Sequence, residues 1–222
     1  MGVHINMLIE KKEELLYWAK RAENSGLCIP KVGNFSLRDP ESGLIVMTPS
    51  GQDRYRCEAQ SMAVLDLDGK WLDGDKPTSE FQMHLAIYKT RPNLHSIAHT
   101  HSRFATVLAV WEKPIPPVVY EVLMFGGSVP VAPYARPGTD ELAKVVGTIF
   151  TGSDACLLAR HGALVAGTDC EDAFLKALYV EETAAVYYHS LLLGQGEEPP
   201  LLELDEVKAW QYPEIKPSDL KK

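Results

Sequence analysis

The stretch HSIAHTHSRFATVLAV at residues 95–110 carries two histidines, His99 and His101, inside an otherwise apolar run. Side chains two apart on a β-strand project from the same face, so this spacing predicts a strand with two imidazoles directed toward one point. The SRFATVLAV part that follows is typical of a helix. Neutral imidazole is a good zinc ligand, but paired histidines on a sheet face are equally compatible with a structural role. The pair indicates a metal site only if other segments supply further ligands.

A third histidine and a carboxylate are the strongest candidates for completing such a site. His161 lies in ARHGALVAG, beside a glycine at the turn between two apolar runs, where a polar ring needs a reason to be present. Glu80 lies in PTSEF, at the first turn expected for a helix, where unpaired amides and the helix dipole favour negative charge. A plain helix-start role for Glu80 stays open at this point. The other histidines are interpreted as structural (His84, His95) or as surface residues (His4, His189).

Three turns offer backbone amides and small polar side chains of the kind found at phosphate sites, because exposed backbone amides bind anionic oxygens. They are Gly33-Asn34, Thr48-Pro49-Ser50-Gly51, and Thr78-Ser79 directly ahead of Glu80. Each turn taken alone is also explained as an ordinary connection between elements.

The patterning of the whole chain predicts a mixed α/β domain. We expect helices over residues 5–24, from Thr78 or Ser79 to before Pro92, over 139–150 with Thr139 as cap, and from a capping box at 168–171 to Gly194. Strands are expected in KVGNFSLRD, LIVMTPSG, MAVLDLDG, SVPVAPY and on both sides of His161-Gly162. This mixture favours a three-layer α/β/α fold with a central, largely antiparallel sheet, formed by residues 1–222 as one domain with a loosely packed tail from about residue 197.

Composition narrows the class of protein. The chain has 222 residues, with 30 acidic and 22 basic side chains and a net charge of -8. That charge argues against non-specific binding to nucleic acid or to an anionic membrane. The four cysteines show no C-x-x-C spacing and suit reduced thiols. Since there is no signal-peptide pattern and no apolar run of the ~18 residues that a membrane span needs, we expect a cytoplasmic protein.

Taken in order, VGNFSLR, LIVMTPSG, PTSEF, HTHSRFATVLAV and RHGALVAG resemble the class II aldolase/adducin family over about residues 5–194. The resemblance implies a lyase that depends on a divalent metal, normally zinc, with manganese or cobalt as alternatives. It also implies a homotetramer with active sites at subunit interfaces. The implied metal ligands are His99, His101 and His161, with Glu80 as fourth ligand in the resting enzyme and as catalytic acid/base. The implied contacts of a substrate phosphate are Gly33, Asn34, Ser50, Gly51, Thr78 and Ser79.

The second acid/base separates the branches of this family. Aldolases resemble one another in a tyrosine 19 residues beyond the second histidine, reaching a neighbouring subunit's site, and this chain has Tyr120 there. The 4-epimerases of pentulose phosphates carry aspartates where this chain has Met124 and Glu80. The resemblance therefore implies reversible cleavage of a ketose 1-phosphate, such as L-fuculose 1-phosphate or a close deoxyketose 1-phosphate. The products would be dihydroxyacetone phosphate and a small aldehyde such as lactaldehyde.

Other activities of the family stay open. Glu121, next to Tyr120, keeps open a methylthioribulose-phosphate dehydratase or a sugar-acid phosphate decarboxylase, because the dehydratases use a carboxylate in this region. A non-catalytic, adducin-like module is the least favoured, since that branch lacks the metal histidines. The family's C-terminal tyrosine corresponds to Tyr212 in a poorly matching tail.

Overall fold

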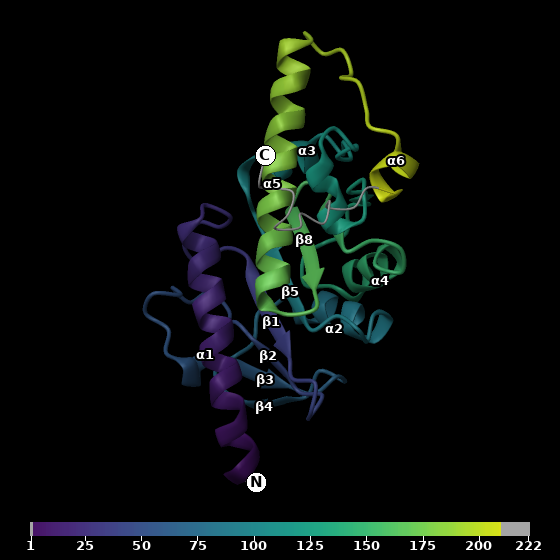
Figure 1. Cartoon of the computed structure of the whole chain (residues 1–222). Helices are drawn as coiled ribbons and strands as arrows, with labels where there is room; N and C mark the ends of the chain where they lie inside the picture. Colours follow the sequence, from purple (N-terminus) through teal and green to yellow (C-terminus); the bar gives the residue numbers. More distant parts are fainter. Residues whose placement is uncertain (1, 210–222) are drawn as a thin grey trace, which may run out of the picture.

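Eight strands form one central sheet, and helices cover both of its faces (Figure 1). The computed structural model describes residues 2–209, apart from the side chains of residues 2–7, Leu204, Val207 and Lys208. The strands are β1 (Asn34–Arg38), β2 (Ile45–Met47), β3 (Ala63–Leu65), β4 (Trp71–Asp73), β5 (Ser96–Thr100), β6 (Val131–Ala132), β7 (Ala155–Leu158) and β8 (Gly162–Gly167). The helices are α1 (Gly2–Asn24), α2 (Phe81–Thr90), α3 (Arg103–Val110), α4 (Asp140–Ile149), α5 (Cys170–Leu193) and α6 (Leu204–Ala209), with 3-10 turns η1 (Ala59–Ser61) and η2 (Tyr120–Phe125).

The strands lie in the order β4-β3-β2-β1-β5-β8-β7-β6. Every neighbouring pair is antiparallel except β6 and β7, which run parallel. Helices α1, α3 and α5 pack on one face of the sheet, and α2 and α4 pack on the other. The predicted three-layer α/β/α fold with a largely antiparallel sheet is confirmed.

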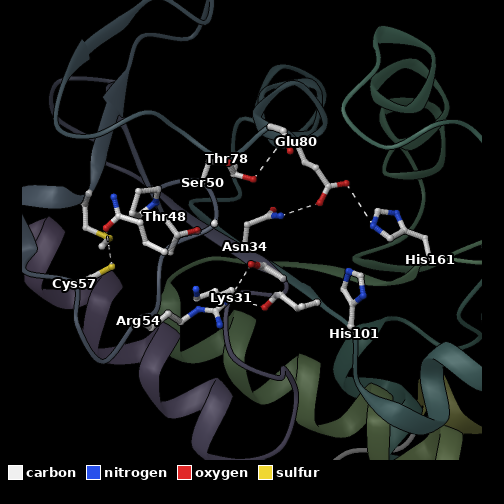
Figure 2. A pocket seen from close by; sticks show the side chains of 17 residues that line it. Lys31, Asn34, Thr48, Ser50, Arg54, Cys57, Thr78, Glu80, His101 and His161 are labelled. Carbon is white, nitrogen blue, oxygen red and sulfur yellow. Dashed lines mark hydrogen bonds and ion pairs between the residues drawn. The ribbon is translucent and has the colours of Figure 1, made fainter.

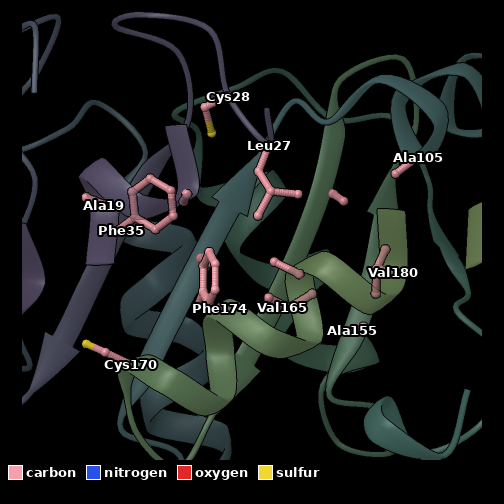
Figure 3. Packing of buried hydrophobic residues seen from close by; sticks show 14 of the residues in the cluster. Ala19, Leu27, Cys28, Phe35, Ala105, Ala155, Val165, Cys170, Phe174 and Val180 are labelled. Atoms are coloured by element: carbon pink, nitrogen blue, oxygen red, sulfur yellow. The ribbon is translucent and has the colours of Figure 1, made fainter. Parts of the chain in front are cut away.

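Strand β8 illustrates how the sequence builds two cores around one sheet. Ala163 and Val165 lie in the core beneath α1, α3 and α5, whereas Leu164 and Ala166 lie in the core beneath α2 and α4. A strand covered on both faces is apolar throughout, which is why GALVAG shows no polar alternation. Figure 3 shows Phe174 of α5 and Phe35 of β1 packed in the first of these cores. Burial of each such ring contributes about 1.5–3 kcal/mol.

The start of α2 differs from the prediction. The helix begins at Phe81 with Glu80 at the N-cap, not at Thr78 or Ser79. Thr78 instead forms a preceding turn, in which its hydroxyl accepts the Glu80 N–H (3.3 Å) and its carbonyl accepts the Phe81 N–H (3.3 Å). Glu80 therefore lies at the junction of turn and helix, and its side chain makes no capping hydrogen bond.

The capping box predicted for α5 is displaced by one residue. Asp169, not Thr168, is the N-cap and accepts the Asp172 N–H (2.8 Å), while the Asp172 carboxylate accepts the Thr168 N–H (2.9 Å). The carboxylates at 169 and 172 thus fill the reciprocal roles that the sequence pattern gave to Thr168 and Glu171. Thr139 caps α4 as predicted, accepting the Leu142 N–H (3.3 Å).

Smaller elements account for the other differences. The strand predicted in SVPVAPY is reduced to β6, and neither β4 nor α6 was predicted.

The tail after α5 is mostly exposed at residues 197–203. Even so, the Leu202 N–H bonds the Pro117 carbonyl (2.8 Å), and Glu198 contacts Lys113 and Tyr187. Tyr212 and the side chain of His4 lie outside the described residues. Within residues 2–209, no helix is long and apolar enough to cross a membrane.

Candidate active site

Three histidines meet where β5 ends and β7 turns into β8. His99 lies on β5, paired with Asn34 on β1 and Leu164 on β8. His101 follows the last residue of β5, and His161 lies in the tight turn that joins β7 to β8. Their ligating nitrogens lie within 4.8 Å of one another, and they are the group of described residues suited to hold a metal ion. The convergence predicted for His99 and His101 is present, with Nε2 atoms 3.0 Å apart.

The hydrogen bonds of His99 fix how its ring faces the cluster. Its Nδ1 lies 2.9 Å from the Ala163 carbonyl, so Nδ1 carries the proton and Nε2 presents a lone pair. The His101 Nε2 faces that lone pair directly. Two lone pairs at this distance repel, so either a proton or a cation must lie between them. A backbone acceptor behind a ligating histidine is the usual arrangement at metal centres.

Glu80, the N-cap residue of α2, adds a carboxylate to the three histidines. Its Oε2 lies 3.4 Å from the His99 Nε2, and its Oε1 lies 3.5 Å from the His161 Nε2. Its Oε2 also accepts the Asn34 Nδ2–H (2.9 Å). Figure 2 shows the Glu80 carboxylate between Asn34 and His161. Oε1 is buried without a hydrogen bond to any described residue, which fits a role as metal ligand or proton acceptor.

The cluster is electrostatically prepared for a cation. Burial, followed by the neighbouring imidazoles, holds the pKa of His99 well below its ordinary value. Burial and then His161 lower the pKa of His101 to about 4. Burial also lowers the pKa of His161, against the opposing effect of Glu80. The rings are therefore neutral near pH 7, and a divalent ion meets three lone pairs and one carboxylate instead of competing protons.

These lowered pKa values predict how the stability of the metal-free protein depends on pH. A histidine with a folded pKa of about 4 and an ordinary value of 6.5 binds more protons in the unfolded chain across that interval. The contribution of His101 to the free energy of unfolding is therefore complete above pH 6.5, and it is lost as the pH drops toward 4. Thermal unfolding of chelated protein, followed by circular dichroism, should show a shallower fall for His101→Asn than for the unchanged chain. The exposed His189 supplies the control, His189→Asn; equal slopes for all three proteins would contradict the prediction.

Beside the cluster lies a cavity of about 230 Å³. It is lined by Glu80, His101 and His161 at one side, whereas His99 is fully buried behind them. All six residues predicted to contact a phosphate also line it: Gly33, Asn34, Ser50, Gly51, Thr78 and Ser79. The Ser50 N–H already bonds the Lys76 carbonyl (2.9 Å), so the hydroxyl of Ser50 is the group it offers. The fold thus brings three turns, far apart in sequence, around one polar space (Figure 2).

Two cations that the sequence reasoning missed, Lys31 and Arg54, also line this cavity. Arg54 is buried, pairs with Glu23 (2.7 Å), and donates to the carbonyls of Val32 (2.6 Å) and Gly33 (2.7 Å). It therefore fixes the turn that carries Gly33. Gly33 itself has φ +75°, and a Cβ there would lie 2.6 Å from both the Cys28 Sγ and the His99 carbonyl oxygen. Only glycine fits this position without displacing β5.

Other predicted residues lie elsewhere in the described chain. Tyr120 opens η2, is 42% exposed, and is not among the residues lining the cavity of its own chain. Glu121 and Met124 are exposed on the same turn. His189 is exposed as predicted, and His95 is half-buried. His84 is fully buried on α2, as expected for a structural histidine, but its contacts lead to the site.

Known proteins resemble this chain in sequence and in structure. The family model of the Class II Aldolase and Adducin N-terminal domain matches residues 13–188. The 5-deoxy-D-ribulose 1-phosphate aldolase of Bacillus thuringiensis serovar kurstaki is 35% identical over 91% of this chain and 94% of its own. The 3-oxo-tetronate 4-phosphate decarboxylase of Escherichia coli O6:H1 is 33% identical over 80% of this chain and 85% of its own. A solved L-fuculose 1-phosphate aldolase superposes with TM-score 0.85 at 35% identity, covering 89% of this chain and 92% of that one.

Proposed function

Because the chain belongs to the class II aldolase and adducin N-terminal family, we propose that it is a metal-dependent aldolase that reversibly cleaves a ketose 1-phosphate. The products are dihydroxyacetone phosphate and a small aldehyde. One observation carries the proposal: Glu80 and three neutral imidazoles converge beside a cavity lined by hydroxyls, two glycine-bearing turns and two cations. Such a cavity suits a phosphorylated sugar, since its phosphate needs amides and cations at one end and its oxygens need a metal at the other.

The proposed metal centre consists of His99, His101 and His161, with Glu80 as a fourth ligand in the resting enzyme. The class II aldolases of this family depend on a metal, typically zinc, and we assign zinc here, with manganese or cobalt as substitutes of similar ligand preference. A bound divalent ion supplies Lewis-acid polarisation of the substrate's carbonyl and neighbouring hydroxyl oxygens.

The protein's own residues then move the protons. Cleavage breaks the bond between carbons three and four, so the hydroxyl on carbon four loses a proton and carbon three gains one. Glu80 is suited to hold the second proton, because Oε1 is buried beside His161 without a hydrogen bond to a described residue. The Asn34 amide keeps Oε2 in place (2.9 Å). Lys31, Ser50 and Thr78 are suited to orient the phosphate from the other end of the cavity.

We assign the transfer of the first proton to Tyr120 of a neighbouring subunit in a homotetramer: its hydroxyl donates this proton to the aldehyde oxygen in condensation, and its phenolate accepts it in cleavage. The exposed position of Tyr120 outside its own chain's cavity supports this assignment. Tyr120→Phe alone should lower kcat about 10²-fold. If each site combines Glu80 from one subunit with Tyr120 from the next, co-expressed Glu80→Gln and Tyr120→Phe chains should recover about a quarter of normal activity, because half of the sites keep Glu80 and half of those face an intact tyrosine. No recovery above the separate variants would place both residues in one subunit.

A product assay tests the proposed reaction. Metal-loaded protein is offered L-fuculose 1-phosphate, 5-deoxyribulose 1-phosphate and methylthioribulose 1-phosphate, and dihydroxyacetone phosphate is measured by coupled oxidation of NADH. The similarity to L-fuculose 1-phosphate and 5-deoxy-D-ribulose 1-phosphate aldolases supports a substrate with a deoxygenated tail. Absence of dihydroxyacetone phosphate with every ketose would overturn the proposal.

The same assay includes 3-oxo-tetronate 4-phosphate, because the decarboxylase relative is nearly as similar. Decarboxylation of this β-keto acid releases carbon dioxide and leaves dihydroxyacetone phosphate. Both products from this compound, with no dihydroxyacetone phosphate from any ketose 1-phosphate, would identify a decarboxylase instead. A dehydratase would convert methylthioribulose 1-phosphate without releasing any aldehyde. Glu121, which left that activity open, is exposed outside the cavity of its own chain. An epimerase is disfavoured by Glu80 and Met124, and a non-catalytic module by the intact histidine cluster.

A further inference from the structure

A continuous row of buried side chains connects the Glu80 carboxylate to the middle of α2. The Asn34 Nδ2–H bonds the Glu80 Oε2 (2.9 Å), and the Asn34 Oδ1 lies 2.6 Å from the His84 Nε2. The His84 Nδ1 lies 2.7 Å from the Ser36 Oγ, which lies 2.8 Å from the Tyr88 hydroxyl. All five residues are buried, with His84 and Ser36 fully so. A buried polar row of this kind is costly unless each member is satisfied, so its geometry is tightly specified.

The carboxylate determines the direction of every hydrogen bond in the row. Since Glu80 is an acceptor, the Asn34 NH₂ must face it, and the Asn34 Oδ1 must face His84. The His84 Nε2 therefore carries the proton, and Nδ1 accepts from the Ser36 hydroxyl. Burial lowers the pKa of His84 to about 3, so the ring stays neutral and keeps one tautomer. Since the Ser36 proton goes to His84, the Tyr88 hydroxyl donates to the Ser36 Oγ (2.8 Å), which is nearer than its other acceptor, the His95 carbonyl (3.3 Å). The donors between Tyr88 and Glu80 therefore all point toward Glu80.

We propose that His84 is a positioning residue for the reaction: acting through Asn34, it holds the Glu80 carboxylate facing the three histidines. This inference rests on the proposed function of the metal centre. The row orients Glu80 but does not conduct protons to it, because passage through the Asn34 amide would require a high-energy imidic acid. Without the Nε2–H of His84, the Asn34 amide loses the contact that fixes its rotation. Its NH₂, the side-chain donor to Glu80 among the described residues, is then no longer held toward the carboxylate.

The first test needs neither substrate nor metal. Long-range ¹H–¹⁵N spectra of protein labelled at histidine distinguish the two neutral tautomers of a buried ring. We expect His84 as the Nε2–H tautomer, and its Nδ1–H tautomer would overturn the inference. This outcome is independent of whether the proposed reaction is found.

The second test is a double-variant cycle on zinc affinity, measured by competition with a chromogenic chelator. His84→Leu should weaken zinc binding about tenfold or more, as outer-shell losses do. His84→Gln, which keeps a donor near the Nε2 position, should remain within about threefold of the unchanged protein. In a Glu80→Gln background, His84→Leu should have no further effect, because the group that it positions is already lost. Equal effects in both backgrounds, or none in either, would overturn the inference.

The third measurement separates positioning from a general loss of structure. Ile87→Val changes another fully buried residue of α2 and should leave zinc affinity and kcat unaltered. His84→Leu should lower kcat about tenfold or more with KM changed less than about threefold, because the phosphate contacts stay in place. A rise in KM with unchanged kcat would contradict the assignment. If the unchanged protein cleaves no ketose phosphate, the proposed function fails, and the tautomer and zinc measurements still decide the role of His84.

Discussion

Glu80→Gln is expected to lower kcat by about 10²–10⁴-fold, the usual contribution of a positioned acid/base. Glutamine keeps the size of the side chain and an oxygen that accepts from Asn34, but it cannot hold a proton at the position of Oε1. The variant should fold normally, since Glu80 makes no capping hydrogen bond to α2. Steady-state kinetics on the ketose 1-phosphate that gives product in the panel assay, together with a thermal unfolding scan, measures both effects.

The matched control for this substitution is Glu141→Gln. Glu141 is an exposed carboxylate in the first turn of α4, so it undergoes the same chemical change at a similar place in a helix. Its kcat should equal that of the unchanged protein. Retention of kcat by Glu80→Gln would exclude Glu80 as the acid/base, whatever its contribution to metal binding.

Removal of the metal is expected to abolish turnover, with a loss of about 10³-fold or more, since Lewis-acid stabilisation contributes several kcal/mol. Protein treated with a chelator and desalted should regain activity with zinc, manganese or cobalt to different extents. Metal should also raise the unfolding temperature, by mass action of a ligand that binds the folded state. Activity assays and calorimetry before and after addition of metal measure the two effects.

His101→Ala serves as the control for metal removal. It deletes one of the three converging nitrogens but leaves His99, which is oriented by the Ala163 carbonyl. This variant should bind less than one metal per chain, and its unfolding temperature should no longer respond to added zinc. Full turnover by chelated protein with no measurable metal would contradict a metal-dependent reaction.

The sequence alone predicted the parts of this protein that depend on local pattern. Alternation and glycine-bearing turns predicted the strands other than β4, and apolar periodicity predicted most helices. The spacing of His99 and His101 predicted their convergence from strand geometry. The resemblance supplied His161, Glu80 and the phosphate-contacting turns as one set, and the structure brings these residues together around one cavity. The assigned chemical roles, the tetramer and the place of Tyr120 remain predictions for the experiments above.

Only the tertiary structure decided which buried polar groups become partners. Glu80 was expected in the first turn of α2, yet it is the N-cap, and its side chain turns toward Asn34, 46 residues away in sequence. His84 was interpreted as a structural histidine, and the importance of Arg54 was not anticipated. Their partners are set by the pairing of β1 with β5 and by the packing of α2 against the sheet. Local periodicity shows which face of an element is buried, but it carries no information about the distant donor that a buried acceptor will meet. The sequence thus determined the residue types of the site, and packing determined how they are held.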